Sequence, residues 1–246
     1  MLKILPQIKN KKYLIAAVIC FVAWELTVVH FMYTVRFSLF SYICIISSCL
    51  FCALMSDGSR AWLYTQLGLI GTVGADFFLV FLPVQLRVPG MIFFCGTQLA
   101  YFMRIVSEDE NPIRRRVNLI LRALASVGGL ILTPIVLGSR VDTVAMLSVF
   151  YYANLICNVM FSFLNFKQTG LFAIALLSFV LSDTLLGFQS LSDYFLIPRG
   201  SFIYYAVLFG KRIFYPLYIF SQIAIPISFA LKRLKKQPQR EESLVK

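Results

Sequence analysis

Two short segments of this sequence each place one aspartate inside a long apolar run. They are VGADFFLVF at residues 73–81 and VLSDTLLGF at residues 180–188, and both read Val, any residue, a small residue, Asp, two residues, Leu, one residue, Phe. A charged group at the centre of a membrane helix costs roughly 2.5 to 3.5 kcal/mol, so it normally faces the bundle interior and serves a function. Asp76 and Asp183 are therefore candidates for proton transfer, and a structural hydrogen bond between helices is the alternative.

Other polar residues recur around these aspartates. TQLA at residues 97–100 follows the first aspartate run, and SQIA at residues 221–224 follows the second, so Gln98 and Gln222 occupy matching places. Because the partners lie four apolar runs apart, the pattern predicts two parallel repeats of four helices. Glu25 lies in the first run at a similar predicted depth, which makes it a third carboxylate that should face inward.

The elements that must position these residues are membrane-spanning helices. Of 246 residues 59% are hydrophobic and 14% are charged, and the mean hydropathy is +0.81, which is typical of a polytopic membrane protein. Crossing a bilayer takes about 20 apolar residues. We predict an all-α integral membrane protein with about eight spans, seven or nine being the alternatives; the eight lie near 13–32, 37–55, 61–82, 88–106, 118–137, 142–164, 170–189 and 213–231. Residues 190–212 also allow a re-entrant or interfacial segment.

The spans form one predicted polytopic membrane domain, residues 1–231, with halves at 13–106 and 118–231. Residues 232–246 are interpreted as a basic tail, a helix end followed by a short disordered segment. Basic residues gather on the side that holds both ends of the chain, which predicts cytoplasmic termini; they include Lys11, Lys12, Arg60, Arg104, Arg114, Arg115, Arg116, Lys232 and Lys235. We interpret the net charge of +12 as this bias with contacts to anionic membrane lipids, and not as nucleic-acid binding.

Several kinds of site are not indicated. All six cysteines fall inside apolar runs and His30 is the single histidine, a pattern that favours neither disulfides nor a metal site. The sequence contains no nucleophile elbow, Walker loop or dinucleotide fingerprint, so we predict no cofactor and no metal.

Four of the segments together resemble a known family. GADFFLVFLP (residues 74–83), FFCGTQLAYF (93–102), VLSDTLLGF (180–188) and YIFSQIAI (218–225) follow one another in the order of the conserved spans of the YhhN-like membrane proteins, whose animal members are lysoplasmalogenases. The chain departs from the family pattern in two places. It has Gln98 where the family usually has His three residues before the tyrosine of span four, here Tyr101, and it lacks a Lys-Pro at the start of span two. The resemblance is therefore to a divergent member.

The resemblance implies hydrolysis of the vinyl ether of a lysoplasmalogen, with a lysophospholipid-like small molecule and membrane lipids as partners. Two neighbouring carboxyls suit this chemistry, because one can hold a proton while the other stays ionised. Asp76 and Asp183 are the expected catalytic pair, within about 10 Å of each other across a polar cavity. The expected substrate contacts are Glu25, Gln98, Tyr101, Ser182, Tyr218 and Gln222.

Two other classes of function remain open from the sequence. Carboxylates at one depth within parallel repeats are equally typical of a proton-coupled transporter. A non-catalytic lipid-binding protein or scaffold is the third possibility. Release of an aldehyde from a lysoplasmalogen by purified protein would separate the hydrolase from both, since it needs no second compartment.

Overall fold

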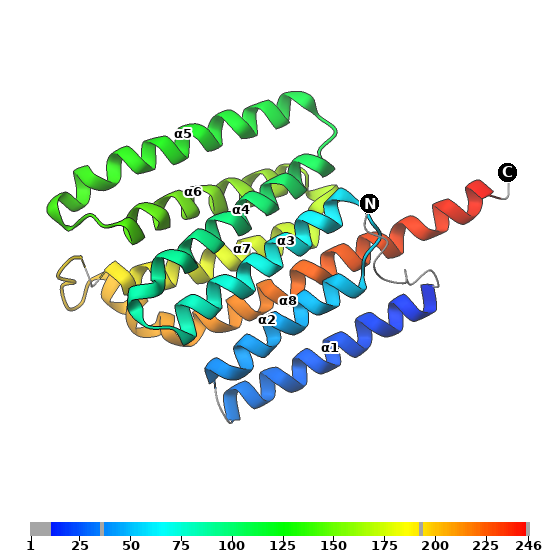
Figure 1. The fold of residues 1–246 in the computed structure, drawn as a ribbon, viewed down its shortest axis with the longest axis horizontal. Helices are drawn as coiled ribbons and strands as arrows, with labels where there is room; N and C mark the ends of the chain where they lie inside the picture. The colour runs from blue at the N-terminus through cyan, green and yellow to red at the C-terminus, as the bar shows by residue number, and fades with distance from the viewer. Residues whose placement is uncertain (1–10, 35–36, 192–193, 245–246) are drawn as a thin grey trace.

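The computed structural model describes residues 11–34, 37–191 and 194–244, and among these it is all helical, without a strand (Figure 1). The long helices are α1 Lys11–Thr34, α2 Phe37–Leu54, α3 Arg60–Asp76, α4 Arg87–Glu108, α5 Pro112–Leu137, α6 Thr143–Leu164, α7 Phe166–Ser190 and α8 Phe202–Leu244. Three short segments complete them: the π-helix η1 Phe77–Phe81 and the 3-10 turns η2 Val84–Leu86 and η3 Gly138–Arg140. The predicted all-α fold class is confirmed.

The helices match the predicted apolar windows one for one. Within the described residues, seven helices are long and apolar enough to cross a membrane, and α2 contributes a shorter apolar stretch, Leu39–Leu54. Helix α8 differs most from its window, because it has 43 residues and begins at Phe202. Residues 202–212 are therefore the first turns of α8 and form no separate re-entrant helix.

The same helix extends through most of the predicted tail. Its backbone is helical to Leu244, where the sequence suggested a short disordered segment. The side chains of residues 236–244 lie outside the described part of the structure, as do residues 245–246 of the tail and residues 1–10 of the predicted membrane domain.

Local hydrogen bonds fix where several helices begin. The side chain of Ser59 accepts a bond of 3.1 Å from the backbone N–H of Trp62 and caps α3. Asp142 caps α6 through the N–H of Ala145 at 2.7 Å. Asn111 caps α5, which starts with a proline, a residue suited to the first helical position. These caps let short connections reverse the chain between neighbouring helices.

An ion pair holds the connection between α4 and α5. Arg114 donates a hydrogen bond of 2.6 Å to each carboxylate oxygen of Asp109. These bonds keep the pKa of Asp109, which lies between the two helices, below its usual value. Arg114 also donates to the backbone oxygen of Leu164 at 3.1 Å, so the same side chain ties the end of α6 to this connection.

Six helices form a closed ring, in the order α2, α3, α4, α6, α7 and α8, with α8 contacting α2. Helix α1 packs outside the ring against α2 and α8, and α5 packs outside it against α6 (Figure 1). The pairings recur after a shift of four helices: α1–α2 corresponds to α5–α6, α2–α3 to α6–α7, α3–α4 to α7–α8, and α4–α6 to α8–α2. This is the arrangement that two parallel four-helix repeats require.

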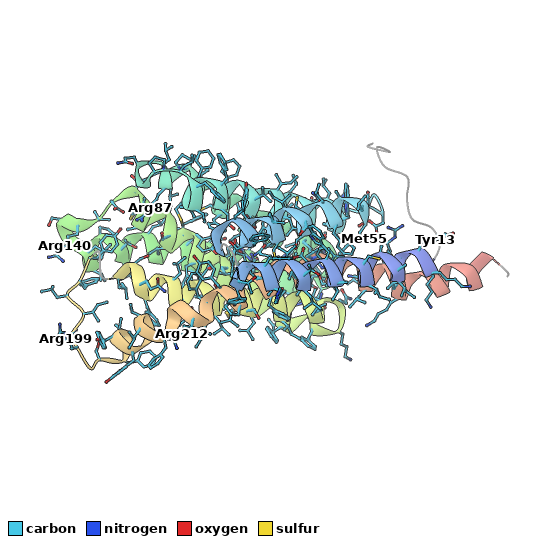
Figure 2. The ribbon with its side chains drawn as sticks, turned by 90° about the horizontal axis from the view of Figure 1, so that it is seen from below. Tyr13, Met55, Arg87, Arg140, Arg199 and Arg212 are labelled. Atoms are coloured by element: carbon cyan, nitrogen blue, oxygen red, sulfur yellow. The ribbon has the colours of Figure 1, made fainter. Side chains whose placement is uncertain are left out.

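The two ends of the bundle differ in charge. The start of α1 and the end of α8 lie together at what we call the basic end, where the starts of α3, α5 and α7 bring their arginines and lysines (Figure 1). In Figure 2 the opposite end is marked by Arg87, Arg140 and Arg199, and the basic end is on the side of Tyr13 and Met55. The prediction that the basic end faces the cytoplasm follows from this charge asymmetry.

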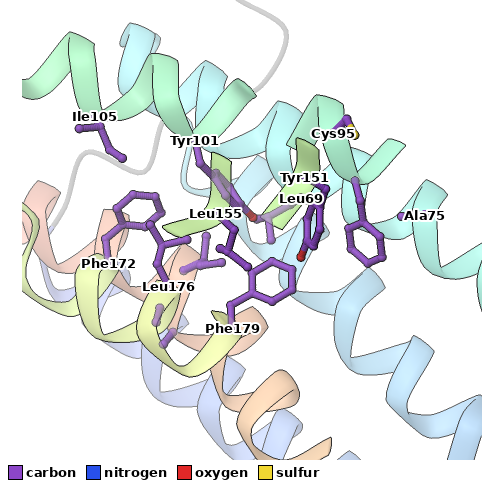
Figure 3. Close-up of a cluster of buried hydrophobic side chains, with 14 of the residues drawn as sticks. Leu69, Ala75, Cys95, Tyr101, Ile105, Tyr151, Leu155, Phe172, Leu176 and Phe179 are labelled. Carbon is purple, nitrogen blue, oxygen red and sulfur yellow. The ribbon is translucent and has the colours of Figure 1, made fainter. Parts of the chain in front are cut away.

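The largest group of buried apolar side chains lies inside the ring (Figure 3). It runs from Ile105 and Phe172 past Leu155, Leu176 and Phe179 to Tyr151 and Ala75. Glycine allows α3 and α4 to approach closely here, because a Cβ at Gly68 would lie 2.2 Å from Cε1 of Tyr101. Many large apolar side chains outside this cluster are exposed, as expected for a surface that meets lipid acyl chains.

Candidate functional site

Asp76 ends α3 and lies inside the bundle, with only 6% of its surface exposed. The phenol of Tyr218, from α8, donates a hydrogen bond of 2.6 Å to Asp76 Oδ2. The helix changes from α to π geometry directly after Asp76, in η1. Single π-helical turns are frequent at functional sites, because they redirect the side chains around them.

Asp183 lies in α7 and is half-buried. The phenol of Tyr151, a buried residue of α6, donates a short hydrogen bond to Asp183 Oδ2. Each aspartate of the repeated motif is therefore held through its Oδ2 by a tyrosine from a neighbouring helix. Tyr218 was an expected site residue, whereas the sequence analysis missed Tyr151.

The two aspartate–tyrosine pairs lie near each other inside the bundle. Asp76 and Asp183 interact electrostatically with each other, and each also interacts with the tyrosine bonded to the other. Two phenylalanine rings pack between them: the ring of Phe94 lies 5.3 Å from Tyr151, and that of Phe179 lies 5.5 Å from Tyr218. Figure 3 shows Tyr151 and Phe179 in this part of the cluster.

Gln98 and Gln222 are both fully buried, on α4 and α8. The Nδ2 of Asn158 on α6 donates to the backbone oxygen of Gln98 at 2.9 Å and to its Oε1 at 3.0 Å. Gln222 donates from Nε2 to the hydroxyl of Ser221 at 3.2 Å. Gln222 lies one helical turn from Tyr218, about 6 Å along α8, so it borders the aspartate site.

Ser182 and Tyr101 are also buried, but they occupy different layers. Ser182 adjoins Asp183 in the chain. The ring of Tyr101 packs edge-on against Phe172, 5.6 Å away, and covers Gly68. Tyr101 is thus further toward the basic end than Gln98, in the apolar cluster and not beside the carboxylates.

Glu25 does not join the aspartates. It is buried between α1 and α2, with 1% of its surface exposed, and accepts a short hydrogen bond from Ser47. Helix α1 packs outside the ring, so the equal depth of Glu25 places it on a different side of the bundle. The structure gives no support to the expectation that Glu25 contacts the same substrate as Asp76.

A buried charge cluster lies toward the basic end of the same interior. Arg104, counted above as a basic flank, is 1% exposed; it donates a 2.9 Å bond to Ser228 and lies 3.8 Å above the ring of Phe172. Its Nε is 3.9 Å from Glu108, which in turn is 3.1 Å from Lys232. Ser228 is ten residues beyond Tyr218 on α8, about 15 Å along the helix, so this cluster is separate from the aspartates.

The second buried cation is Arg122 of α5, 5% exposed, which the sequence analysis did not single out. A signal for it existed, because an arginine inside an apolar run needs polar partners, and Asn154 and Asn158 lie one turn apart on the next run. The structure pairs them directly. Arg122 donates to Oδ1 of Asn154 at 2.8 Å and of Asn158 at 2.7 Å.

The arrangement around the aspartates can move protons. Two carboxyls that share a desolvated site and interact with each other favour a state in which one is protonated and one is ionised. In that state the site offers a general acid and an anion that can stabilise positive charge. A surface depression of about 410 Å³ lies elsewhere, lined by Pro134, Val141, Asp142, Thr143 and Met146; the cavity expected between the aspartates stays a prediction.

Comparison with known proteins assigns the chain to a family. A family model described as the YhhN family matches residues 55–229, which is more than half of the chain. The matched part begins directly after α2 and ends within α8, so it contains both aspartates, both of their tyrosines and both buried glutamines. No curated protein and no solved structure matches. The chain is a member of the YhhN family.

Proposed function

We propose that this protein is a membrane-embedded hydrolase that cleaves the vinyl ether of a lysolipid to an aldehyde and a glycerophospho-alcohol. The observation that carries the proposal is the placement of Asp76 on α3 and Asp183 on α7 near enough to influence each other, with a tyrosine bonded to each. The resemblance to the YhhN-like proteins, which include lysoplasmalogenases, supplies the substrate class.

The chemistry needs both carboxyls. One of them, in its protonated form, gives its proton to the outer carbon of the alkene, and the electron pair of the double bond forms the new C–H bond. The resulting oxocarbenium ion is stabilised by the ionised partner, which then removes a proton from an attacking water. The hemiacetal collapses to the aldehyde, and the ether oxygen leaves as the hydroxyl of the glycerol part.

Each tyrosine bonds one oxygen of a carboxyl group, which leaves the other oxygen for proton transfer. Tyr218 and Tyr151 both donate to Oδ2. In the proposed reaction Oδ1 of Asp76 and Oδ1 of Asp183 therefore act on the substrate. Asp183 and Tyr218 keep part of their surface exposed at the side of the bundle. In this proposal the substrate reaches the carboxyls from the bilayer past these two side chains.

The test uses purified protein in detergent with a 1-alkenyl lysophosphatidylethanolamine, and it measures aldehyde. Asp76→Asn and Asp183→Asn should each lose nearly all turnover, because Asn keeps the shape and the hydrogen bond but cannot transfer the proton. The double variant should be hardly slower than either single variant, since the two groups act as a unit. In D₂O the aldehyde should carry deuterium at the carbon beside the carbonyl.

Two controls make the result specific. Asp142→Asn keeps its capping function at the start of α6, so it should retain wild-type turnover. A 1-alkyl lysolipid has no alkene to protonate and should give no aldehyde. If both aspartate variants keep full activity, the carboxyls only join helices; if wild-type protein gives no aldehyde but accumulates solute in vesicles under a proton gradient, the protein is a transporter.

A further inference from the structure

The orientation of the Gln98 side chain is fixed by a relay that begins at Arg122. A guanidinium can only donate hydrogen bonds, and Arg122 Nη2 donates to Asn158 Oδ1 at 2.7 Å. The oxygen of the Asn158 amide therefore points at Arg122 and its NH₂ points at Gln98. Because that NH₂ donates to Gln98 Oε1 at 3.0 Å, the NH₂ of Gln98 is directed away from α6.

This relay leaves Gln98 as a buried donor without an acceptor. Gln98 has 0% of its surface exposed, and in the described part of the chain its Nε2 has no hydrogen-bond partner. Gln222 presents the complementary case. It is also 0% exposed and uses its Nε2 on Ser221, and among the described residues its Oε1 has no donor.

Two side-chain contacts between α4 and α8 show that the two amides lie at one level along the bundle. Both helices run toward the basic end. Arg104 bonds Ser228 across the interior, and Glu108 pairs with Lys232; in each pair the two residues are 124 positions apart in the sequence. Gln98 and Gln222 have the same separation. They therefore match in register, six residues or about 9 Å further from the basic end than the Arg104–Ser228 bond.

A free donor and a free acceptor that are both fully buried destabilise the protein unless a bound group satisfies them. We infer that Gln98 and Gln222 together recognise the sn-2 hydroxyl of a lysolipid, which accepts a hydrogen bond from Gln98 Nε2 and donates one to Gln222 Oε1. This inference rests on the proposed function for the identity of the lipid. A hydroxyl is the small group that can accept one bond and donate another at the same oxygen.

The position of the amides fits such a substrate. Tyr218, which donates a hydrogen bond to Asp76, precedes Gln222 by one turn of the same helix. In a lysoplasmalogen only one methylene separates the ether oxygen from the carbon that bears the sn-2 hydroxyl. With the vinyl ether at the aspartates, the hydroxyl therefore falls at the neighbouring layer of side chains. A lipid with a second acyl chain has an ester there, which can accept a bond but cannot donate one to Gln222.

The experiment compares a 1-alkenyl lysophospholipid with its sn-2 deoxy analogue. Wild-type protein should prefer the hydroxyl substrate in kcat/KM by roughly tenfold to a hundredfold, the loss that accompanies unpaired buried groups. Gln98→Leu and Gln222→Leu should bring this ratio close to one. Asn158→Asp keeps the contact with Arg122 but offers no N–H to Gln98, so it should reduce the ratio as a positioning residue.

The matched control is Gln168→Leu, the same change at an exposed position near the start of α7. It should leave the preference for the hydroxyl substrate intact. A second readout needs no turnover: the thermal stabilisation of each protein by a saturated 1-alkyl lysolipid and by its sn-2 deoxy analogue. Only the hydroxyl lipid should stabilise wild-type protein strongly, and the two glutamine variants should respond equally to both.

The outcomes separate this inference from the proposed function. If wild-type protein hydrolyses both alkenyl lipids equally, hydrolysis stands and hydroxyl recognition is wrong. If no aldehyde forms but the hydroxyl lipid still stabilises the wild type more than its analogue, the recognition site stands and the hydrolase is wrong. If Gln98→Leu and Gln222→Leu keep the full preference, a water satisfies the two amides and they play no part in recognition.

Discussion

The two tyrosines that bond the aspartates define the orientation of the carboxyl groups. Tyr218 donates to Asp76 from α8, and Tyr151 donates to Asp183 from α6. A phenol that donates to one carboxyl oxygen fixes the rotation of the whole group and leaves the second oxygen in a defined place. Their role can be tested without changing a charge, because Phe preserves the ring.

Tyr218→Phe and Tyr151→Phe should each lower kcat roughly tenfold, the effect of losing about one hydrogen bond in the site. Folding should be nearly unaffected, since the rings keep their packing against Phe179 and Phe94. Aldehyde release gives the rate, and thermal unfolding in detergent gives the stability.

Tyr152→Phe is the matched control for this prediction. Tyr152 is the neighbour of Tyr151 on α6. Its hydroxyl forms a hydrogen bond with Thr184, the residue after Asp183, and not with a carboxyl. This variant should keep wild-type kcat. Equal losses in all three variants would mean that these hydroxyls serve only to join neighbouring helices.

At the scale of elements, the packing of α3 against α4 determines the relative positions of Asp76 and Gln98 along the bundle. The two helices approach closely at Gly68, where the ring of Tyr101 occupies the space that a side chain would take. Tyr101 is fully buried and packs against Phe172 on its other side, so the ring has no room to withdraw. Glycines at such close approaches are typical of helix pairs in membranes.

Gly68→Ala should therefore destabilise the protein by about 1 to 3 kcal/mol, the usual effect of overpacking. Gly96→Ala on α4 is the control, because a Cβ there meets nothing within 4 Å. Both changes bring the same gain in helix propensity, up to about 1 kcal/mol, so their difference isolates the contact with Tyr101. The unfolding temperature in detergent should fall for Gly68→Ala and rise or stay equal for Gly96→Ala; a shift of the same sign in both would contradict the close approach.

At the scale of the whole molecule, the eight helices form two halves with the same pairings. The ring of six helices contains both aspartate runs and both glutamine runs, while α1 and α5 lie outside it. The two halves meet across the interior, where α4 of one half faces α8 of the other through the Arg104–Ser228 bond. A site built at this junction draws groups from both repeats.

Eight alternating helices also fix the topology of the chain. Reporters fused before Met1 and after Lys246 should be found on the same side of the membrane, and the basic end makes that side the cytoplasm. A reporter inserted at Gly138, in the connection between α5 and α6, should be found on the other side. A C-terminal reporter found reproducibly opposite the N-terminal one would remove a span and separate the two aspartates in depth.

Much of this protein follows from its sequence, because a bilayer imposes simple demands. A helix must offer about 20 apolar residues to cross it, so the windows and their alternation can be located by composition. A carboxylate at that depth must face inward, which singled out Asp76 and Asp183. The motifs around them were sufficient to identify the resemblance to the YhhN family, and the position of each residue along its helix gave the shared depth of the aspartates.

The rotation of each helix and the choice of its neighbours were decided only by the tertiary structure. Glu25 has the right depth but lies on a helix outside the ring. Tyr151 meets Asp183, and Arg122 meets Asn158, because α6 packs against both α7 and α5. An apolar sequence makes nearly every face of a helix acceptable to lipid, so local pattern does not select the buried face. That choice depends on the packing of all the helices together, which places polar groups from distant parts of the chain against one another.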